Sequence, residues 1–371
     1  MKEGVLSDVE IRELINSGAI ISKVPIDDKN QVQPSSMDLR CGLGKNVWRM
    51  DGSTIPNTNM EDYLKLKSRY SFSLEGKKVV LDRGLVYIIR LAESFDLPEG
   101  ISARANPKST TGRWDIHARL LTEKGDEFDN VRSGYKGKLY LEVISQSFDL
   151  EVPSLYTFVQ ARFIRGSRDR LRLNQGMLKY LARSETLLVD FNGNPIPSEK
   201  FIRDGVVGLT LNLRVDNPGY VVRHDAPLVD LSALNDSLDG FEYFNKVNLT
   251  RYGCLSLESN SFYLLTTNEG IVVPSDHCAE MEDSSAAKGE FRVHYAGFFD
   301  PGFGNVRKKG KIMGAQATLE VRNTSPNRII LNDGQNIADL RYNFMASNPS
   351  RDYSGNYQGQ RGVRGPKQIH F

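Results

Sequence analysis

Residues 105–113, with the sequence Ala-Asn-Pro-Lys-Ser-Thr-Thr-Gly-Arg, combine side chains that could bind a phosphorylated molecule. Lys108 and Arg113 bring positive charge, Ser109 and the two following threonines bring hydroxyls, and Gly112 frees the backbone. Such a set suits a polyphosphate, where cations and hydrogen-bond donors converge on many oxygens. It is not a Walker loop, because the GxxxxGK pattern is absent. From these residues alone, a phosphate-binding loop and an ordinary polar loop remain equally open.

A second stretch, residues 296–304, reads Ala-Gly-Phe-Phe-Asp-Pro-Gly-Phe-Gly. It predicts a strand, a tight turn and a return, because Asp300 and the Pro-Gly pair after it are strong turn formers. Gly304 would let backbone approach either backbone or a ligand. The return strand, 315–322, carries the single carboxylate Glu320 between β-forming residues. This hairpin could hold a small polar ring by its edges, and an ordinary surface hairpin is the alternative.

Both stretches resemble the dCTP deaminase family within the dUTPase-like superfamily. Residues 296–303 resemble the hairpin that binds the substrate base, and 105–113 resemble the phosphate-binding motif. Near the end of the chain, Asn-Tyr-Gln-Gly-Gln-Arg-Gly at 356–362 resembles the closing C-terminal motif. The family usually has arginine where Lys108 stands. The lysine keeps the positive charge but lacks the planar guanidinium of arginine. The usual tail lysine is not obvious, since Asn356 precedes the tyrosine.

The composition is that of an ordinary globular protein. Charged residues make up 25% of the 371 positions, hydrophobic residues 39%, and the net charge is +2. We therefore expect no nucleic-acid partner and no membrane association. The three cysteines are far apart and form no CxxC pair, and the N-terminus lacks the apolar core of a signal peptide. These features predict a cytoplasmic protein with reduced thiols.

The chain reads as mainly β with few short helices. Ser7 and Glu10 form a capping-box pattern at the start of a predicted helix over 7–15. β-forming runs dominate the remainder. An internal repeat of about 175 residues indicates two copies of one domain. Matched segments, in the same order in both halves, include 34–40 with 209–214, 86–89 with 262–265, 95–100 with 271–276, 108–112 with 283–288, and 141–143 with 319–321.

The resemblance implies two tandem dUTPase-like domains, each a β-clip or distorted jelly roll. We place the domains at 1–175, with the phosphate-type motif at 105–113, and at 176–371, with the base hairpin at 294–322 and the closing tail at 353–362. Single domains of this family form trimers. A homo-oligomer, a trimer or another multiple of three domains, is therefore expected.

The two halves depart from the family pattern in complementary ways. The first half keeps the phosphate-type motif, but Arg132 stands where the hairpin aspartate is expected. The second half keeps Asp300, but Asp283 stands where a phosphate-binding cation is expected, and its charge would repel phosphate. We therefore predict a composite site, with the phosphate loop of a first half, the hairpin of a second half and the tail closing over both.

Hydrolytic deamination needs an activated water, a proton for the leaving amine and stabilisation of the tetrahedral centre. Zinc deaminases use an H-x-E and a P-C-x-x-C pattern, and neither is present, so no zinc or other protein-bound metal is expected. In the metal-free dCTP deaminase type a glutamate activates the water. Two glutamates match that strand, Glu320 and Glu142, and we choose Glu320 because it shares a hairpin with Asp300, leaving Glu142 as the alternative. Burial could raise its pKa enough to move a proton.

The resemblance assigns further roles. Ser109 and Arg113 would orient the water and stabilise charge, Asp300 would bind the sugar or orient the hairpin, and Tyr357 and Gln360 would fold over the triphosphate. The predicted substrate-binding residues are Lys108, Thr110, Thr111, Gly112, Ala296, Asp300, Thr318, Leu319, Tyr357 and Gln360.

The predicted activity is conversion of dCTP to dUTP and ammonia, which supplies dUTP toward thymidylate synthesis. Mg²⁺ would arrive on the triphosphate. One alternative is a dUTP pyrophosphatase or a bifunctional enzyme, although the Gly-Phe-Gly-Ser tail of that type is missing. Another is a silent nucleotide sensor. The number of sites per chain and inhibition by dTTP stay open. The basic segment 305–310, an insertion relative to the family hairpin, could contact phosphate, although an exposed loop is the favoured interpretation.

Overall fold

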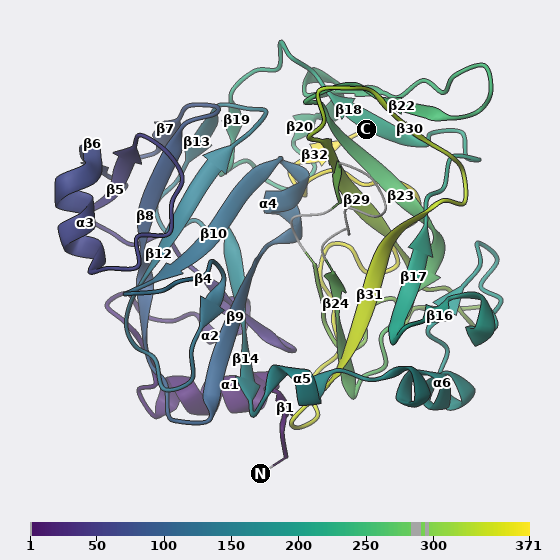
Figure 1. Ribbon diagram of the computed structural model, residues 1–371, viewed down its shortest axis with the longest axis horizontal. Coiled ribbons are helices and arrows are strands. Elements are labelled where there is room, and N and C mark those ends of the chain that lie inside the picture. Colours follow the sequence, from purple (N-terminus) through teal and green to yellow (C-terminus); the bar gives the residue numbers. More distant parts are fainter. Residues whose placement is uncertain (1, 283–290, 294–296) are drawn as a thin grey trace. The chain divides into compact units, whose positions relative to one another are not determined.

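The computed structural model describes residues 2–282, 291–293 and 297–371 (Figure 1). They form two compact units that interleave along the chain. Unit 1 comprises Met1–Arg168, Pro227–Leu234 and Ala346–Ser350, so two short segments of the second half of the sequence belong to it. Unit 2 comprises the remainder. The sequence-based division into 1–175 and 176–371 stays a prediction.

Unit 1 is built from three sheets within the described residues. Two are six-stranded, with the orders β11-β9-β14-β4-β3, where β1 adds to β14, and β10-β12-β8-β5-β6, where β2 adds to β8. The third has the order β19-β13-β7. The strands are β1 (Gly4–Val5), β2 (Ile20–Ser22), β3 (Val32–Gln33), β4 (Ser36–Leu39), β5 (Lys45–Met50), β6 (Ser68–Ser73), β7 (Val79–Leu81), β8 (Val86–Asp96), β9 (Ile101–Pro107), β10 (Ile116–Thr122), β11 (Asn130–Val131), β12 (Lys136–Ser145), β13 (Leu150–Val152), β14 (Val159–Arg165) and β19 (Val229–Asp230).

Unit 2 repeats this plan with two main sheets. One has the order β21-β18-β23-β29-β25 with β15 on β23, and the other β16-β17-β31-β24-β26. Three two-stranded ribbons, β20-β32, β22-β30 and β27-β28, complete the described part. The strands are β15 (Leu188–Val189), β16 (Ile202–Arg203), β17 (Val206–Thr210), β18 (Gly219–Val222), β20 (Leu238–Asp239), β21 (Phe244–Lys246), β22 (Leu255–Leu257), β23 (Phe262–Ile271), β24 (His277–Glu282), β25 (Phe291–Val293), β26 (Phe298–Phe299), β27 (Arg307–Lys308), β28 (Lys311–Ile312), β29 (Ala315–Asn323), β30 (Ile329–Leu331), β31 (Asn336–Phe344) and β32 (Ile369–His370).

Short helices connect the strands, and the prediction of a mainly β fold is confirmed. The expected first helix forms as α1, where the Glu10 carboxylate accepts the Ser7 backbone N–H at 3.2 Å as the capping box requires. The helices are α1 (Asp8–Asn16), α2 (Asp28–Gln31), α3 (Met60–Lys67), α4 (Ser109–Arg113), α5 (Arg168–Leu171) and α6 (Gln175–Ser184), with single 3-10 turns at Ser198–Lys200 and Gly240–Glu242.

Strand register shows that the two units are copies of one plan. In unit 1, Glu142 of β12 lies opposite Ile88 of β8. In unit 2, Glu320 of β29 lies opposite Leu264 of β23. The two candidate bases therefore occupy equivalent positions, as the sequence repeat predicts for 141–143 and 319–321.

One repeat match from the sequence has the wrong register. The backbone N–H of Arg40 donates to the Glu93 carboxylate at 2.8 Å, and the backbone N–H of Thr210 donates to the Glu269 carboxylate at 2.9 Å. Thr210 therefore takes the place of Arg40, whereas the sequence alignment placed Arg214 there. The apolar alternation that guided the match has a period of two, so a shift of four residues preserves it.

Candidate functional site

The phosphate-type motif of unit 1 is a one-turn helix between two strands. β9 ends at Pro107, α4 runs over Ser109–Arg113, and β10 follows (Figure 1). Lys108 caps the helix, its backbone N–H donates to Phe158 O at 2.9 Å, and its ammonium forms an ion pair with Asp38 and a 3.1 Å hydrogen bond to Thr157 Oγ1. The lysine is thus held in place before any ligand arrives.

The remaining side chains of this motif are mostly buried. Thr110, Thr111 and Arg113 are almost inaccessible, while Ser109 is partly exposed. The Thr111 hydroxyl donates its proton to Phe158 O at 2.8 Å, so a ligand could approach only its lone pairs. The predicted roles of these residues stay predictions.

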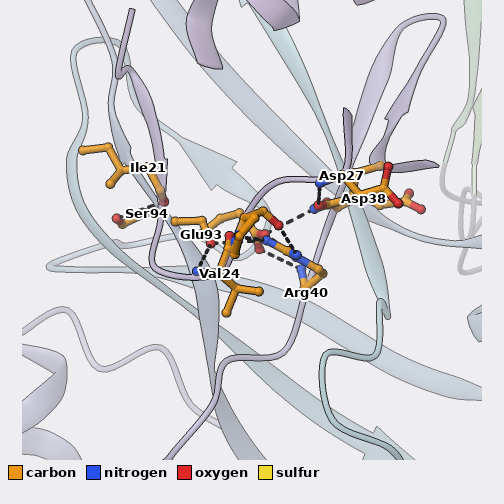
Figure 2. Close-up of polar contacts among 10 residues, drawn as sticks. Ile21, Val24, Asp27, Asp38, Arg40, Glu93 and Ser94 are labelled. Carbon is orange, nitrogen blue, oxygen red and sulfur yellow. Dashed lines mark hydrogen bonds and ion pairs between the residues drawn. The ribbon is translucent and has the colours of Figure 1, made fainter. Parts of the chain in front are cut away.

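Asp38 belongs to a buried polar network that the sequence analysis missed. Figure 2 shows Arg40, whose Nε donates to Glu93 at 2.8 Å. The Gln31 side chain donates to Glu93 at 3.2 Å and to the Asp38 carbonyl at 3.0 Å. Because the Asp38 carboxylate pairs with Lys108, this network fixes the strand that holds the motif's cation. Asp38 is 70 residues from Lys108 in sequence, so no local signal links them.

Glu142, the alternative base, is buried in unit 1 with 3% of its surface exposed. Its Oε1 accepts a 2.7 Å hydrogen bond from Ser53, and within the described part of the chain its Oε2 has no partner in hydrogen-bond geometry. Burial raises the pKa of Glu142, although Ser53, the nearby Thr54 backbone N–H and the Arg119 charge lower it in part. This carboxyl is therefore not a solvent-facing strand residue.

Glu320, the preferred base, lies in unit 2 with 2% of its surface exposed. Side chains alternate along a strand, so Glu320 and Thr318 occupy the same face of β29. Glu320 is also not a solvent-facing carboxylate, and its role as the base stays a prediction.

The predicted tight turn forms around Asp300, which is 7% exposed. The hairpin expected from it is wrong within the described residues, because the strand before the turn, β26, pairs with β24, whereas the return strand β29 pairs with β23 and β25 in the other main sheet. Phe303 N donates to Asp300 O at 3.1 Å, and Gly302 and Gly304 both have positive φ angles. A Cβ on Gly304 would lie 1.8 Å from the carbonyl oxygen of Ile271. Gly304 therefore serves a close approach of backbone to backbone, one of the two expected uses.

The C-terminal tail lies against this turn and against β29. Gln360 Nε2 donates to Thr318 Oγ1 at 2.7 Å, joining two predicted substrate-binding residues. Gln358, which the sequence analysis did not single out, bridges the tail to the turn, accepting from Gly304 N at 2.7 Å and donating to Gly302 O at 2.9 Å. The structure thus brings the turn, the tail and Thr318 together in unit 2.

Tyr357 is also part of this assembly. It is 7% exposed, and the guanidinium of Arg364 lies 5.9 Å from its ring centroid. Leu319 is fully buried and points away from Thr318 and Glu320 by strand alternation.

Several predictions fall outside what the structure can place. Ala296 and the segment 283–288 lie outside the described residues. Lys108 and its neighbours belong to unit 1, whereas Asp300, Glu320 and the tail belong to unit 2. The composite site stays a prediction.

Across 2–282, 291–293 and 297–371, no group of three or more His, Cys, Asp or Glu side chains has an arrangement that could hold a metal ion. Among the helices of this described part, none has the length and apolarity needed to cross a membrane.

Comparison with known proteins gives consistent matches. The family model for the 2'-deoxycytidine 5'-triphosphate deaminase N-terminal domain matches residues 2–167, and that for the C-terminal domain matches 174–369. A dUMP-forming dCTP deaminase of Coprothermobacter proteolyticus is 27% identical over 202 residues, covering 53% of this chain and 95% of the relative. A dCTP deaminase of Haloarcula marismortui is 29% identical over 142 residues, covering 38% of this chain and 68% of the relative.

A solved structure extends the likeness over nearly the whole chain. The crystal structure of 2'-deoxycytidine 5'-triphosphate deaminase from Agrobacterium tumefaciens matches with a TM-score of 0.82 and 33% identity. The match covers 94% of this chain and 100% of that one. The resemblance first drawn from the two motifs and the tail is confirmed.

Proposed function

Because the chain belongs to the 2'-deoxycytidine 5'-triphosphate deaminase family, we propose that it hydrolyses dCTP to dUTP and ammonia. The observation that carries this proposal is the burial of Glu320 on β29, on the face where Gln360 of the tail binds Thr318. A carboxyl shielded from water beside polar side chains and a closing tail suits proton transfer in a site that excludes bulk solvent.

The proposed chemistry uses water as the nucleophile. Glu320 accepts a proton as the water oxygen adds to C4 of the cytosine ring, and the tetrahedral centre forms. The same carboxyl passes this proton to ring N3 and then carries the proton of the C4 hydroxyl to the amine, which leaves as ammonia while the C4 carbonyl of uracil forms. Ser109 and Arg113 are proposed to orient the water and stabilise developing charge. The substrate is the Mg²⁺ complex of dCTP, since Mg²⁺ commonly bridges phosphate oxygens.

A second candidate adds hydrolysis of dUTP to dUMP and diphosphate. The observation that favours it is the naming of several relatives, including those of Methanosphaera stadtmanae and Dictyoglomus thermophilum, as dUMP-forming dCTP deaminases. The Haloarcula marismortui relative is named a dCTP deaminase without that addition. Measurement of the final product, dUTP or dUMP, distinguishes these two candidates.

Further aspects of the proposal concern the protein's setting. We propose a homo-oligomer whose sites combine a Lys108 motif with the turn around Asp300, and a dTTP-sensitive activity. We also propose a cytoplasmic location, where thiols stay reduced, which agrees with three cysteines that form no disulfide bond in the described part of the chain.

The proposal is tested by incubating the purified protein with dCTP and Mg²⁺ and separating products by anion exchange. Glu320→Gln and Glu142→Gln serve as a matched pair, because the two glutamates occupy equivalent buried positions. We expect dUTP from the wild type and a loss of at least about 100-fold in kcat for Glu320→Gln alone. Loss only in Glu142→Gln would move the base to unit 1, and dUMP with diphosphate would support the bifunctional enzyme. Tight binding of dCTP without turnover would refute the deaminase.

A further inference from the structure

The ribbon formed by β27 and β28 carries an unusual concentration of positive charge. Arg307, Lys308, Lys309 and Lys311 are all exposed within a hairpin that spans residues 305–312. Within the described residues, no carboxylate lies within ion-pair distance of any of the four. Lys311 instead donates a 2.9 Å hydrogen bond to Asn194 Oδ1. We call this segment the cationic hairpin.

The cationic hairpin keeps two locally unfavourable features. Lys309 has a φ of 49° and is followed by Gly310 with a φ of 78°, so a lysine occupies the left-handed region that asparagine or glycine prefers. Lys308 and Lys311 lie directly opposite each other, and like charges at such a pair destabilise the strands. Features that break local rules without compensation are expected where a segment serves a function.

The stem of the cationic hairpin is joined to the candidate site by hydrogen bonds. Val306 N donates to Gly304 O at 2.7 Å, and Met313 N donates to Val306 O at 2.8 Å, so the hairpin extends directly from the turn after Asp300. The Arg361 guanidinium of the tail donates to Met313 O. The base of the cationic hairpin is therefore joined to both the turn and the tail.

The charge balance around the hairpin favours an anion of high charge density. Asp190 is a described carboxylate that interacts electrostatically with both Lys311 and Arg361. Its two carboxylate oxygens already accept hydrogen bonds from Asn192 and Asn194. A nucleic acid would also call for aromatic side chains between the cations, and residues 305–312 contain none. A short polyphosphate fits an exposed cluster of flexible lysines better.

We propose that the cationic hairpin binds the polyphosphate of the nucleotide that is held by the turn around Asp300 and by the C-terminal tail. This inference rests on the proposed function, because it takes the ligand to be a deoxynucleoside triphosphate. The lysine ammonium groups attract the triphosphate from solution and hold its outer oxygens, while the turn and tail contact the rest of the nucleotide. Such attraction raises the association rate and weakens as salt screens it.

The test uses Lys308→Gln combined with Lys309→Asn in the full-length chain. Asparagine tolerates the left-handed conformation, and an Asn-Gly pair suits this turn, so the hairpin is expected to stay folded or become more stable. Lys67→Gln is the matched control, since Lys67 is an exposed lysine of α3 in unit 1. Thermal unfolding of all three proteins checks that the fold is retained.

Inorganic tripolyphosphate is the first probe, because its binding by calorimetry needs no turnover. We expect the double variant to bind it about tenfold more weakly at low salt, with a flatter dependence on salt, and Lys67→Gln to match the wild type. With dCTP, kcat/KM should fall by a similar factor while kcat stays within about twofold. Unchanged tripolyphosphate affinity in the double variant would overturn the inference.

The two proposals fail in different ways. If the wild type turns over dCTP but the double variant binds tripolyphosphate normally, only the role of the cationic hairpin is refuted. If the double variant binds tripolyphosphate more weakly but the wild type never deaminates dCTP, the deaminase proposal is refuted and polyphosphate binding by the hairpin stands.

Discussion

Replacement of Thr318 by valine tests how the C-terminal tail is held. The Thr318 hydroxyl accepts from Gln360 Nε2 at 2.7 Å and from Arg364 N at 3.2 Å, and it donates to Arg364 O at 3.1 Å. Valine has nearly the same shape and none of these bonds. Its introduction therefore removes three hydrogen bonds between the tail and β29 with little change in packing, while the bonds of Gln316 to Gly362 N and Gln360 O remain.

The expected magnitude follows from those contacts. A net contribution of about 1 kcal/mol for each hydrogen bond gives about 3 kcal/mol in total. Because about 1.4 kcal/mol is a tenfold change, the open state of the tail should become about 100-fold more populated. The amide hydrogens of residues 358–364 should then exchange far faster than in the wild type, and a protease should cleave this segment far faster.

Amide hydrogen exchange at Arg364 is the direct assay, because its N–H donates to the altered side chain. Trypsin cleavage after Arg361 offers a second measurement. Thr266→Val is the matched control, since Thr266 lies opposite Thr318 and its buried hydroxyl has no hydrogen-bond partner in the described part. Equal exchange rates at Arg364 in the two variants would refute the reasoning.

Two further predictions concern Gly304 and Glu269. Gly304→Ala should destabilise unit 2 by more than about 3 kcal/mol in denaturant unfolding, because the new Cβ would lie 1.8 Å from Ile271 O at a φ of 72°; near-wild-type stability would contradict this. Burial raises the pKa of Glu269 above its usual 4.5, although the Thr210 hydroxyl and backbone N–H partly lower it, so ionisation costs stability as pH rises through the folded pKa. The free energy of unfolding of Glu269→Gln, relative to that of the wild type, should therefore be higher at pH 7.5 than at pH 4.5. A difference between the two proteins that does not change with pH would contradict the raised pKa of Glu269.

The sequence predicts those elements whose signals are local. The segments 86–89 and 141–143, which the sequence repeat matches to the second half, lie within β8 and β12, where consecutive apolar residues are buried. The segment 209–214, matched with 34–40, is a strand only as far as Thr210, where β17 ends. The Thr210 side chain and backbone turn to Glu269 there, a long-range contact that no local pattern indicates.

Other features could not be predicted because they depend on distant pairing. The helix α6 lies at the predicted boundary between 1–175 and 176–371 and is not among the elements expected from the sequence, although Asn174 caps it by accepting Met177 N at 3.0 Å. The strand β19 joins unit 1 by parallel pairing with β13, far away in sequence. Weak caps and long-range strand pairs leave little trace in a window of ten or so residues.

The residues of the candidate site divide in the same way, into those with a local sequence signal and those that only the fold brings together. Motif resemblance found Glu142, Glu320 and Gln360, and their burial was the expected condition for chemistry. The Asp38 partner of Lys108 and the bridging side chain of Gln358 were missed, because an ion pair or hydrogen bond across many residues follows from the fold rather than from spacing.

The most direct test of the deaminase is incubation with dCTP and Mg²⁺ in water enriched in oxygen-18, followed by mass spectrometry of the products. Hydrolytic deamination predicts one heavy oxygen on the uracil ring and one equivalent of ammonia for each dCTP consumed. An unchanged cytosine ring, with heavy oxygen only in released phosphate or with no product at all, would contradict it.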